Sequence, residues 1–281
     1  MSRAQPLEAP DSLLPLPRPL MTGEVLDAAF RLFRAGLARC LPYSGLAVLV
    51  FELPTVYSTF VAPSFPLTAA AGFAGAHSRA ITWCISLLLS TALLGVIALR
   101  LQAVSRARRP RFRSEILTVL KRWPAALIPT FVALAFPFTL FGLSSVIASI
   151  VPGPGLLIIG VPLLWPTALF VVTLPAFWCD ELGPFAAISF SWRVSRRRSW
   201  RMFGALLATG AMVTVIYAVA AIMVAVLSQF MGRADLVLIA TMTSLVALIV
   251  GAVGLPFVVA VLIVALEDLK LRERARGGVH G

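Results

Sequence analysis

Six long apolar stretches, separated by short polar segments, set the pattern of this chain. They cover about residues 41–62, 80–99, 124–150, 155–178, 202–227 and 236–266. A helix needs roughly 20 apolar residues to cross the hydrocarbon core of a bilayer. None of the stretches alternates between apolar and polar residues, as the strands of a membrane barrel would. The pattern therefore predicts an all-α polytopic membrane protein with about six transmembrane helices.

Residues 22–38 precede the first apolar stretch and follow a helical pattern of their own. Their apolar residues fall on one arc of a helix, at about 100° per residue, and their charged residues on the opposite arc. Thr22 is expected to cap this helix, and Asp27 to pair with Arg31 four residues later. We predict a short cytoplasmic helix lying flat in the membrane interface. The alternative is a cytosolic helix packed on loops of the same protein.

Two shorter segments repeat this pattern before later apolar stretches. Ser114 is expected to cap a helix that carries Leu117 on its apolar side. Pro184 suits the first turn of another helix, with Phe185 and Trp192 on one stripe. The chain then consists of three units, each an interfacial amphipathic helix followed by two spans. The alternative is that the segments are unrelated, because short cytoplasmic loops beside a membrane are often amphipathic.

Basic residues fall almost entirely on one side of this six-span arrangement. Of the 24 lysines and arginines, only Arg79 and Arg233 lie on the other side. Lys and Arg in short loops stay on the cytoplasmic side, so both termini are predicted to be cytoplasmic, in the inner membrane of a bacterium. We predict three regions: a disordered Pro-rich tail (1–21), a single membrane domain (22–267) and a basic cytoplasmic tail (268–281).

Composition excludes several classes of protein. Hydrophobic residues make up 59% of the 281, charged residues only 13%, and the mean hydropathy is +0.94. A soluble domain of this length could not bury so much apolar surface, so a soluble enzyme is excluded. Three scattered cysteines give no disulfide framework, and two histidines cannot build a histidine-rich metal site. No nucleophile with a base is recognisable, and we predict no catalytic residue, metal or cofactor.

The net charge of +12 is concentrated in the cytoplasmic loops. Orientation already explains basic loops, so nucleic acid is not expected as a partner. The arginines are nevertheless denser than orientation needs, and each gains about 1 kcal/mol near an anionic leaflet. Asp180 and Glu181 share a loop with some of them and are expected to pair there. The candidate contacts to anionic lipid headgroups are Arg106, Arg108, Arg109, Arg111, Arg113, Arg196, Arg197 and Arg198.

Glu52 is the only charge near the middle of a predicted span. A charge at the bilayer centre costs about 2.5–3.5 kcal/mol on insertion scales, so Glu52 needs a partner. Pro54 lacks an N–H and frees a carbonyl near Val50. A protonated Glu52 could donate to that carbonyl, or to the hydroxyl of Ser58 or Ser86, which would be a structural role. The alternatives are a proton- or cation-binding site, and a shifted or re-entrant first span that places Glu52 at a water-filled recess.

Three segments carry a resemblance to a known family. They are Thr22-Gly-Glu-Val-Leu-Asp-Ala-Ala-Phe-Arg-Leu-Phe-Arg34, Pro175-Ala-Phe-Trp-Cys-Asp-Glu-Leu-Gly-Pro184 and Ala265-Leu-Glu-Asp-Leu-Lys-Leu-Arg-Glu-Arg274. Together they resemble the bacterial family of membrane domains of glycerophosphoryl diester phosphodiesterase, over about residues 20–275. Glu267-Asp268-Leu269-Lys270 departs from the Tyr-Asp-Leu-Arg-type run of that family. The resemblance implies a membrane module without the catalytic barrel that some members carry.

These observations favour a non-enzymatic integral membrane module over other functions. We expect it to organise lipids, or an unidentified membrane or cytoplasmic partner protein, at the cytoplasmic face. The alternative is a transporter of small solutes or lipids, with its path between Pro-broken helices. A transporter of polar solutes or ions would normally show several buried charges, and the predicted spans show one.

Overall fold

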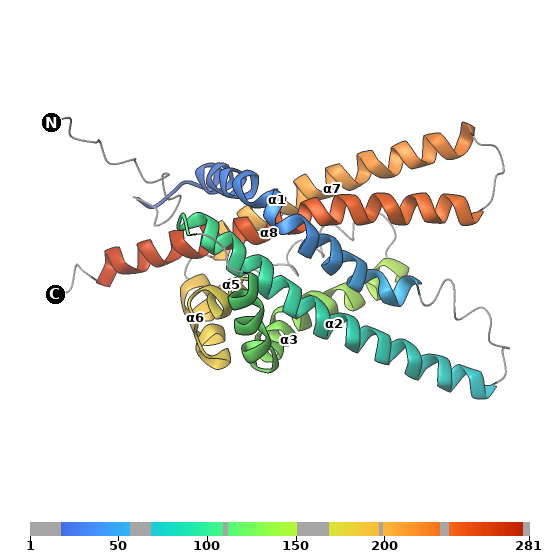
Figure 1. Cartoon of the computed structure of the whole chain (residues 1–281), viewed down its shortest axis with the longest axis horizontal. Helices are drawn as coiled ribbons and strands as arrows, with labels where there is room; N and C mark the ends of the chain where they lie inside the picture. The colour runs from blue at the N-terminus through green and yellow to red at the C-terminus, as the bar shows by residue number, and fades with distance from the viewer. Residues whose placement is uncertain are drawn as a thin grey trace.

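The computed structural model of the protein is a bundle of helices (Figure 1). It describes residues 18–56, 69–108, 112–150, 169–196, 199–230 and 236–277, with side chains over slightly shorter ranges. These residues form seven helices and no strand, which confirms the all-α prediction. The helices are α1 (Thr22–Val56), α2 (Ala69–Ser105), α3 (Phe112–Ile150), α5 (Thr173–Cys179), α6 (Pro184–Arg196), α7 (Ser199–Phe230) and α8 (Leu236–Gly277).

Five of these helices contain segments long and apolar enough to cross a membrane. The segments are Thr22–Leu53, Ile81–Ser105, Phe112–Ala133, Trp200–Val226 and Thr241–Ala275. They match five of the six predicted spans, so the chain is a multi-span membrane protein. Most of the predicted fourth span, 155–178, lies outside the described residues. Its last part forms the short helix α5, which is almost wholly buried in the bundle.

The predicted boundaries between amphipathic segments and spans are wrong in two places. Segment 22–38 and the first span form one helix, α1, and the segment at Ser114 is continuous with the third span in α3. Prolines 42 and 124 lie at the two expected breaks, but a helix that enters apolar surroundings continues through a proline because a full break would leave more backbone groups unbonded. Figure 1 shows the bend that results in α1.

The boundaries between the two predicted tails and the membrane domain also lie elsewhere than expected. Helix α8 passes through position 268 without interruption, and Asp268 and Leu269 are buried. Residues 18–20 of the predicted N-terminal tail are described, and Leu20 is buried as well. The remainder of that tail, 1–17, lies outside the described residues. The tail boundaries at 21 and 268 therefore cut through packed structure.

The core lies at the end of the bundle where α1 begins and α8 ends (Figure 1). From Pro256 to Leu269 nearly every residue of α8 is buried, and α1 is the helix that α8 contacts most extensively. The short helix α5 can pack close to α2 because position 95 of α2 is a glycine. A Cβ added at Gly95 would lie 2.7 Å from the Trp178 ring of α5. The other halves of α7 and α8 form a protruding hairpin with exposed apolar side chains, as lipid contact requires.

Serine hydroxyls bond two of the carbonyls that prolines leave free in α1 and α8. Pro54 removes the helical partner of the Val50 carbonyl, and Ser86 Oγ of α2 donates to that oxygen at 2.8 Å. Pro256 does the same to the Ala252 carbonyl, which accepts from Ser44 Oγ of α1 at 2.6 Å. The Val50 carbonyl is thus bonded by Ser86, and the suggested bond from Glu52 to it is not formed.

Candidate functional site at the basic end

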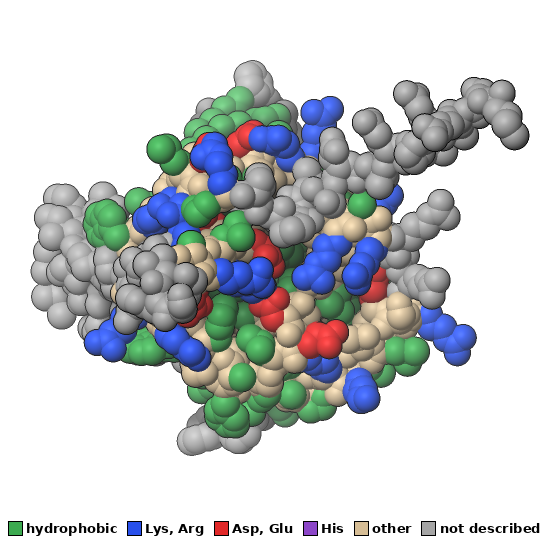
Figure 2. All heavy atoms as spheres, turned by 90° about the vertical axis from the view of Figure 1, so that its left-hand side faces the viewer, with side chains coloured by type: hydrophobic (Ala, Val, Ile, Leu, Met, Phe, Trp, Pro, Cys, Tyr) green, Lys and Arg blue, Asp and Glu red, His purple; other side chains and the backbone are tan. Residues whose placement is uncertain are grey.

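Basic side chains gather on the end of the bundle that holds the core (Figure 2). One group of them is exposed, and none of its members forms an ion pair with a described residue. These side chains come from α1, the α2–α3 connection, α3, α6 and the end of α8. They are Arg34, Arg39, Arg106, Arg108, Arg113, Lys121, Arg193, Arg196 and Arg274.

A second group of basic side chains points into the protein and joins the helices to one another. Arg100 of α2 donates to Glu115 of α3 at 2.9 Å and to the Arg39 carbonyl of α1 at 2.8 Å. Its guanidinium also lies 4.4 Å from the centre of the Tyr43 ring. Both partners of the Arg100–Glu115 pair are largely buried, with side chains 13% and 9% exposed. This residue fixes three helices at one point.

The segment around α5 is held in the same way. Arg122 of α3 donates to the Leu182 carbonyl at 2.7 Å and stacks over Phe177, while Lys270 of α8 pairs with Asp180. Asp180 was expected to pair with the arginines of its own loop, and this prediction is wrong. Its partner lies 90 residues away because α5 packs directly against α8.

Cys179 ends α5 between this ion pair and α2. Burial, and to a lesser extent the neighbouring Asp180 carboxylate, raise the pKa of its thiol to about 12. A thiol with such a pKa remains protonated at neutral pH and is a poor nucleophile and metal ligand. Among the described residues, no group of three or more His, Cys, Asp and Glu side chains could hold a metal ion.

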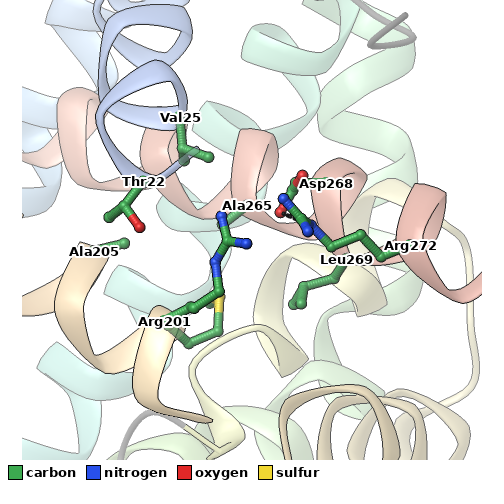
Figure 3. A pocket seen from close by; sticks show the side chains of 9 residues that line it. Thr22, Val25, Arg201, Ala205, Ala265, Asp268, Leu269 and Arg272 are labelled. Atoms are coloured by element: carbon green, nitrogen blue, oxygen red, sulfur yellow. Dashed lines mark hydrogen bonds and ion pairs between the residues drawn. The ribbon is translucent and has the colours of Figure 1, made fainter. Parts of the chain in front are cut away.

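A small pocket lies where α1, α7 and α8 meet (Figure 3). The backbone of Leu20 bonds three of the residues that line it: its N–H donates to Asp268 at 2.7 Å, and its carbonyl accepts from Arg201 at 2.7 Å and from Arg272 at 2.5 Å. Arg272 also donates to Asp268 at 2.8 Å. The hollow that remains, about 20 Å³, is large enough for one water molecule.

The beginning of α1 packs differently from the prediction of a helix flat in the interface. Its apolar residues Val25, Ala29 and Leu32 are buried, mainly against α8, so this face is not free to contact lipid. The exposed Asp27–Arg31 pair is confirmed. The cap is not Thr22, since the helix already contains it; the Met21 N–H donates to Glu24 at 2.6 Å instead, which is half of a capping box.

Helices α3 and α6 carry their apolar residues outward. Leu117 and Leu120 of α3 are 58% and 63% exposed, whereas Glu115 on the other side is buried. On α6, which begins at Pro184 as predicted, Phe185 is 73% exposed, and the buried residues are Ala187, Ser191, Val194 and Ser195. Figure 1 shows α6 lying across the long axis along which α2, α7 and α8 run. Ser114, expected as the cap of α3, lies inside the helix.

The structure describes four of the eight arginines predicted to contact lipid headgroups. Arg106, Arg108, Arg113 and Arg196 are exposed at the basic end. The other predicted contacts, Arg109, Arg111, Arg197 and Arg198, lie outside the described residues.

Glu52 is half-buried, far from the basic end. No hydrogen bond or ion pair joins it to another described residue, although it is close enough to Tyr217 of α7 to interact with it electrostatically. The part of α1 that carries Glu52 thus lies near α7. Ser58, the other hydroxyl suggested for it, is outside the described residues.

Sequence reasoning missed the group of basic residues that points inward. Arg100, Arg122, Arg201, Lys270 and Arg272 were counted only as loop charges that set the orientation. The available signal was their position, because each lies next to an apolar stretch and within a helix rather than in a loop.

No family model matches the chain, and no curated protein or solved structure matches it.

Proposed function

We propose that the protein is a non-enzymatic membrane module whose basic end binds anionic lipid headgroups at the cytoplasmic face of a bacterial inner membrane. The observation that carries this proposal is the combination of exposed arginines without carboxylate partners and outward apolar residues on α3 and α6. In water such exposed leucine and phenylalanine side chains would be unfavourable. At a membrane surface they enter the acyl region while the arginines reach the phosphates.

The orientation follows from the same residues. Of the 24 lysines and arginines, 22 fall on one side of the six-span arrangement predicted from the sequence, and such residues stay on the cytoplasmic side of a bacterial membrane. Both termini are therefore proposed to be cytoplasmic. The resemblance to the membrane domains of glycerophosphoryl diester phosphodiesterase agrees with a module of this kind. A partner protein at the same face would meet the same charged surface.

The test replaces five arginines, four in the α2–α3 connection and one in the first turn of α3, with glutamine: Arg106, Arg108, Arg109, Arg111 and Arg113. The protein is purified with its lipids, and the ratio of retained phosphatidylglycerol to phosphatidylcholine is measured by mass spectrometry. We expect a fall of about tenfold or more in this ratio, since each arginine contributes about 1 kcal/mol near anionic lipid. Insertion into the membrane should be unchanged.

The matched control replaces Arg18 and Arg31, which are exposed but paired with Glu24 and Asp27. Their positive charges are already compensated, so the lipid ratio should change much less. Equal retention of the two lipids by the native protein would refute the proposed function. The proposed function would also be refuted if the control variant lost as much phosphatidylglycerol as the variant with five arginines replaced.

A further inference from the structure

Two arginines at the pocket of Figure 3 share one uncharged oxygen atom. Arg201 of α7 and Arg272 of α8 both donate to the carbonyl of Leu20. Guanidinium groups bind carboxylate and phosphate oxygens more strongly than neutral carbonyls, and often with two donors at once. Two guanidinium groups that converge on one oxygen atom are the arrangement expected around an oxyanion. Here the peptide oxygen of Leu20 occupies the position that an oxyanion would take.

The charges around this oxygen do not balance. Asp268 accepts a hydrogen bond from Arg272 and pairs with it, whereas no carboxylate of the described residues pairs with Arg201. The pocket therefore holds one positive charge in excess. A ligand with a single negative charge, such as a phosphodiester or a monoanionic phosphate, would bring the pocket to neutrality.

We propose that this pocket is a phosphate-binding site whose arginine donors are occupied by the Leu20 peptide. Arg201 and Arg272 both donate to the Leu20 carbonyl, so a phosphate can take both donors only if Leu20 leaves. Departure of Leu20 also breaks the hydrogen bond from its N–H to Asp268. Phosphate binding thus releases the N-terminal segment from the end of α8. The inference rests on the proposed function and deepens it, because it gives one specific site and a consequence of binding.

Hydrogen exchange of the backbone tests the proposal, since the Leu20 N–H is itself one of the bonds that break. The full chain is placed in discs of phosphatidylcholine, and exchange of residues 18–24 is followed by mass spectrometry. One arm adds inorganic phosphate, with sodium chloride at equal ionic strength as the reference. A second arm replaces part of the phosphatidylcholine with phosphatidylglycerol and adds no phosphate.

We expect exchange in residues 18–24 to accelerate at least about tenfold in one or both arms, which corresponds to loss of one charge-assisted hydrogen bond. A response only to phosphatidylglycerol identifies the ligand as a lipid headgroup. A response only to inorganic phosphate identifies it as a soluble phosphate. No acceleration in either arm refutes the site.

Arg201→Gln should abolish the response, because it removes the uncompensated charge. Arg106→Gln is the matched control, since Arg106 is an exposed arginine of the same end that does not line the pocket. If Arg106→Gln removes the response as completely as Arg201→Gln, the effect is one of general surface charge and the site is refuted. Should Arg201→Gln fail to fold, Arg201→Lys, which keeps the charge but loses the two-donor fork, should weaken the response.

The failure of this site and that of the proposed function are distinguishable. The proposed function depends on the exposed arginines between α2 and α3 and is measured by lipid retention. The pocket depends on Arg201 and is measured by the exchange of residues 18–24. A protein that retains phosphatidylglycerol but shows no accelerated exchange has the function without the site.

Discussion

Ser44 and Ala252 lie 208 residues apart and are joined by a 2.6 Å hydrogen bond from the serine hydroxyl to the alanine carbonyl. Pro256 makes this bond necessary, because it removes the N–H that would otherwise bond the same carbonyl. The proline inside α8 and the most extensive interhelical contact of that helix, with α1, are therefore linked by one hydrogen bond.

We predict that Ser44→Ala costs about 1–3 kcal/mol of stability, the penalty for leaving a buried carbonyl unbonded. In a Pro256→Ala background the cost should be much smaller, since residue 256 then supplies the missing N–H. Thermal unfolding in detergent of the two single variants and the double variant measures this difference. Ser189→Ala, at an exposed serine of α6 that bonds the Ala186 carbonyl of its own helix, is the control and should have little effect. Equal costs of Ser44→Ala in both backgrounds would contradict the explanation.

The same reasoning separates Ser86 from Glu52. Because Ser86 bonds the carbonyl freed by Pro54, Ser86→Ala should loosen α1 from α2 at a similar cost of about 1–3 kcal/mol. Neither Glu52→Gln nor Glu52→Leu should lower the unfolding temperature as much. A variant Glu52→Gln that folds normally and yet loses a cellular activity would instead support the proton- or cation-binding alternative. Unfolding curves and abundance in the membrane provide both comparisons.

Removal of one partner of the buried Arg100–Glu115 pair should be severe. Arg100→Met leaves the Glu115 carboxylate buried without its partner, and breaking such pairs typically costs about 3–5 kcal/mol. The double variant Arg100→Met with Glu115→Leu should recover much of that loss. Arg31→Met, at the exposed pair with Asp27, is the control and should cost less than about 1 kcal/mol. If the two arginine variants are equally stable, Arg100 does not join the helices as described.

The proposed orientation gives a fourth prediction. Reporter fusions after residues 112, 190 and 275 should be cytoplasmic, and fusions after 70, 153 and 232 should be external, because nearly all basic residues belong to the first set of loops. Alkaline phosphatase and fluorescent protein reporters distinguish the two sides. An external signal after residue 112 or 190 would overturn the orientation and, with it, the proposed contact with the cytoplasmic leaflet.

Span positions were predictable because the bilayer imposes a length on every apolar helix, and five of the six predicted spans overlap a helical segment of the required length and apolarity. Which side of an amphipathic segment faces the protein was not predictable from periodicity alone. The apolar side turns inward at Val25 and Leu32 but outward at Leu120. The helical wheel is the same in both cases, and only the neighbouring helices decide.

Ion-pair partners were predicted correctly only within one helix. The spacing of Asp27 and Arg31 fixes their distance whatever the tertiary structure. Asp180 and Lys270 meet only because α5 packs on α8, and no local pattern contains that information. The pocket beside Leu20 was hidden for the same reason, since its residues come from three separate parts of the chain.

The central position of the last helix has a consequence for biosynthesis. When α1 enters the membrane, the helix that will cover Val25, Ala29 and Leu32 has not yet been translated, and neither has the carbonyl that Ser44 will bond. The early helices must therefore remain in the bilayer as loosely associated segments until ribosomal synthesis has passed residue 269. A chain that stops before α8 would lack the centre of its fold, and such truncated chains should be rapidly degraded by membrane proteases.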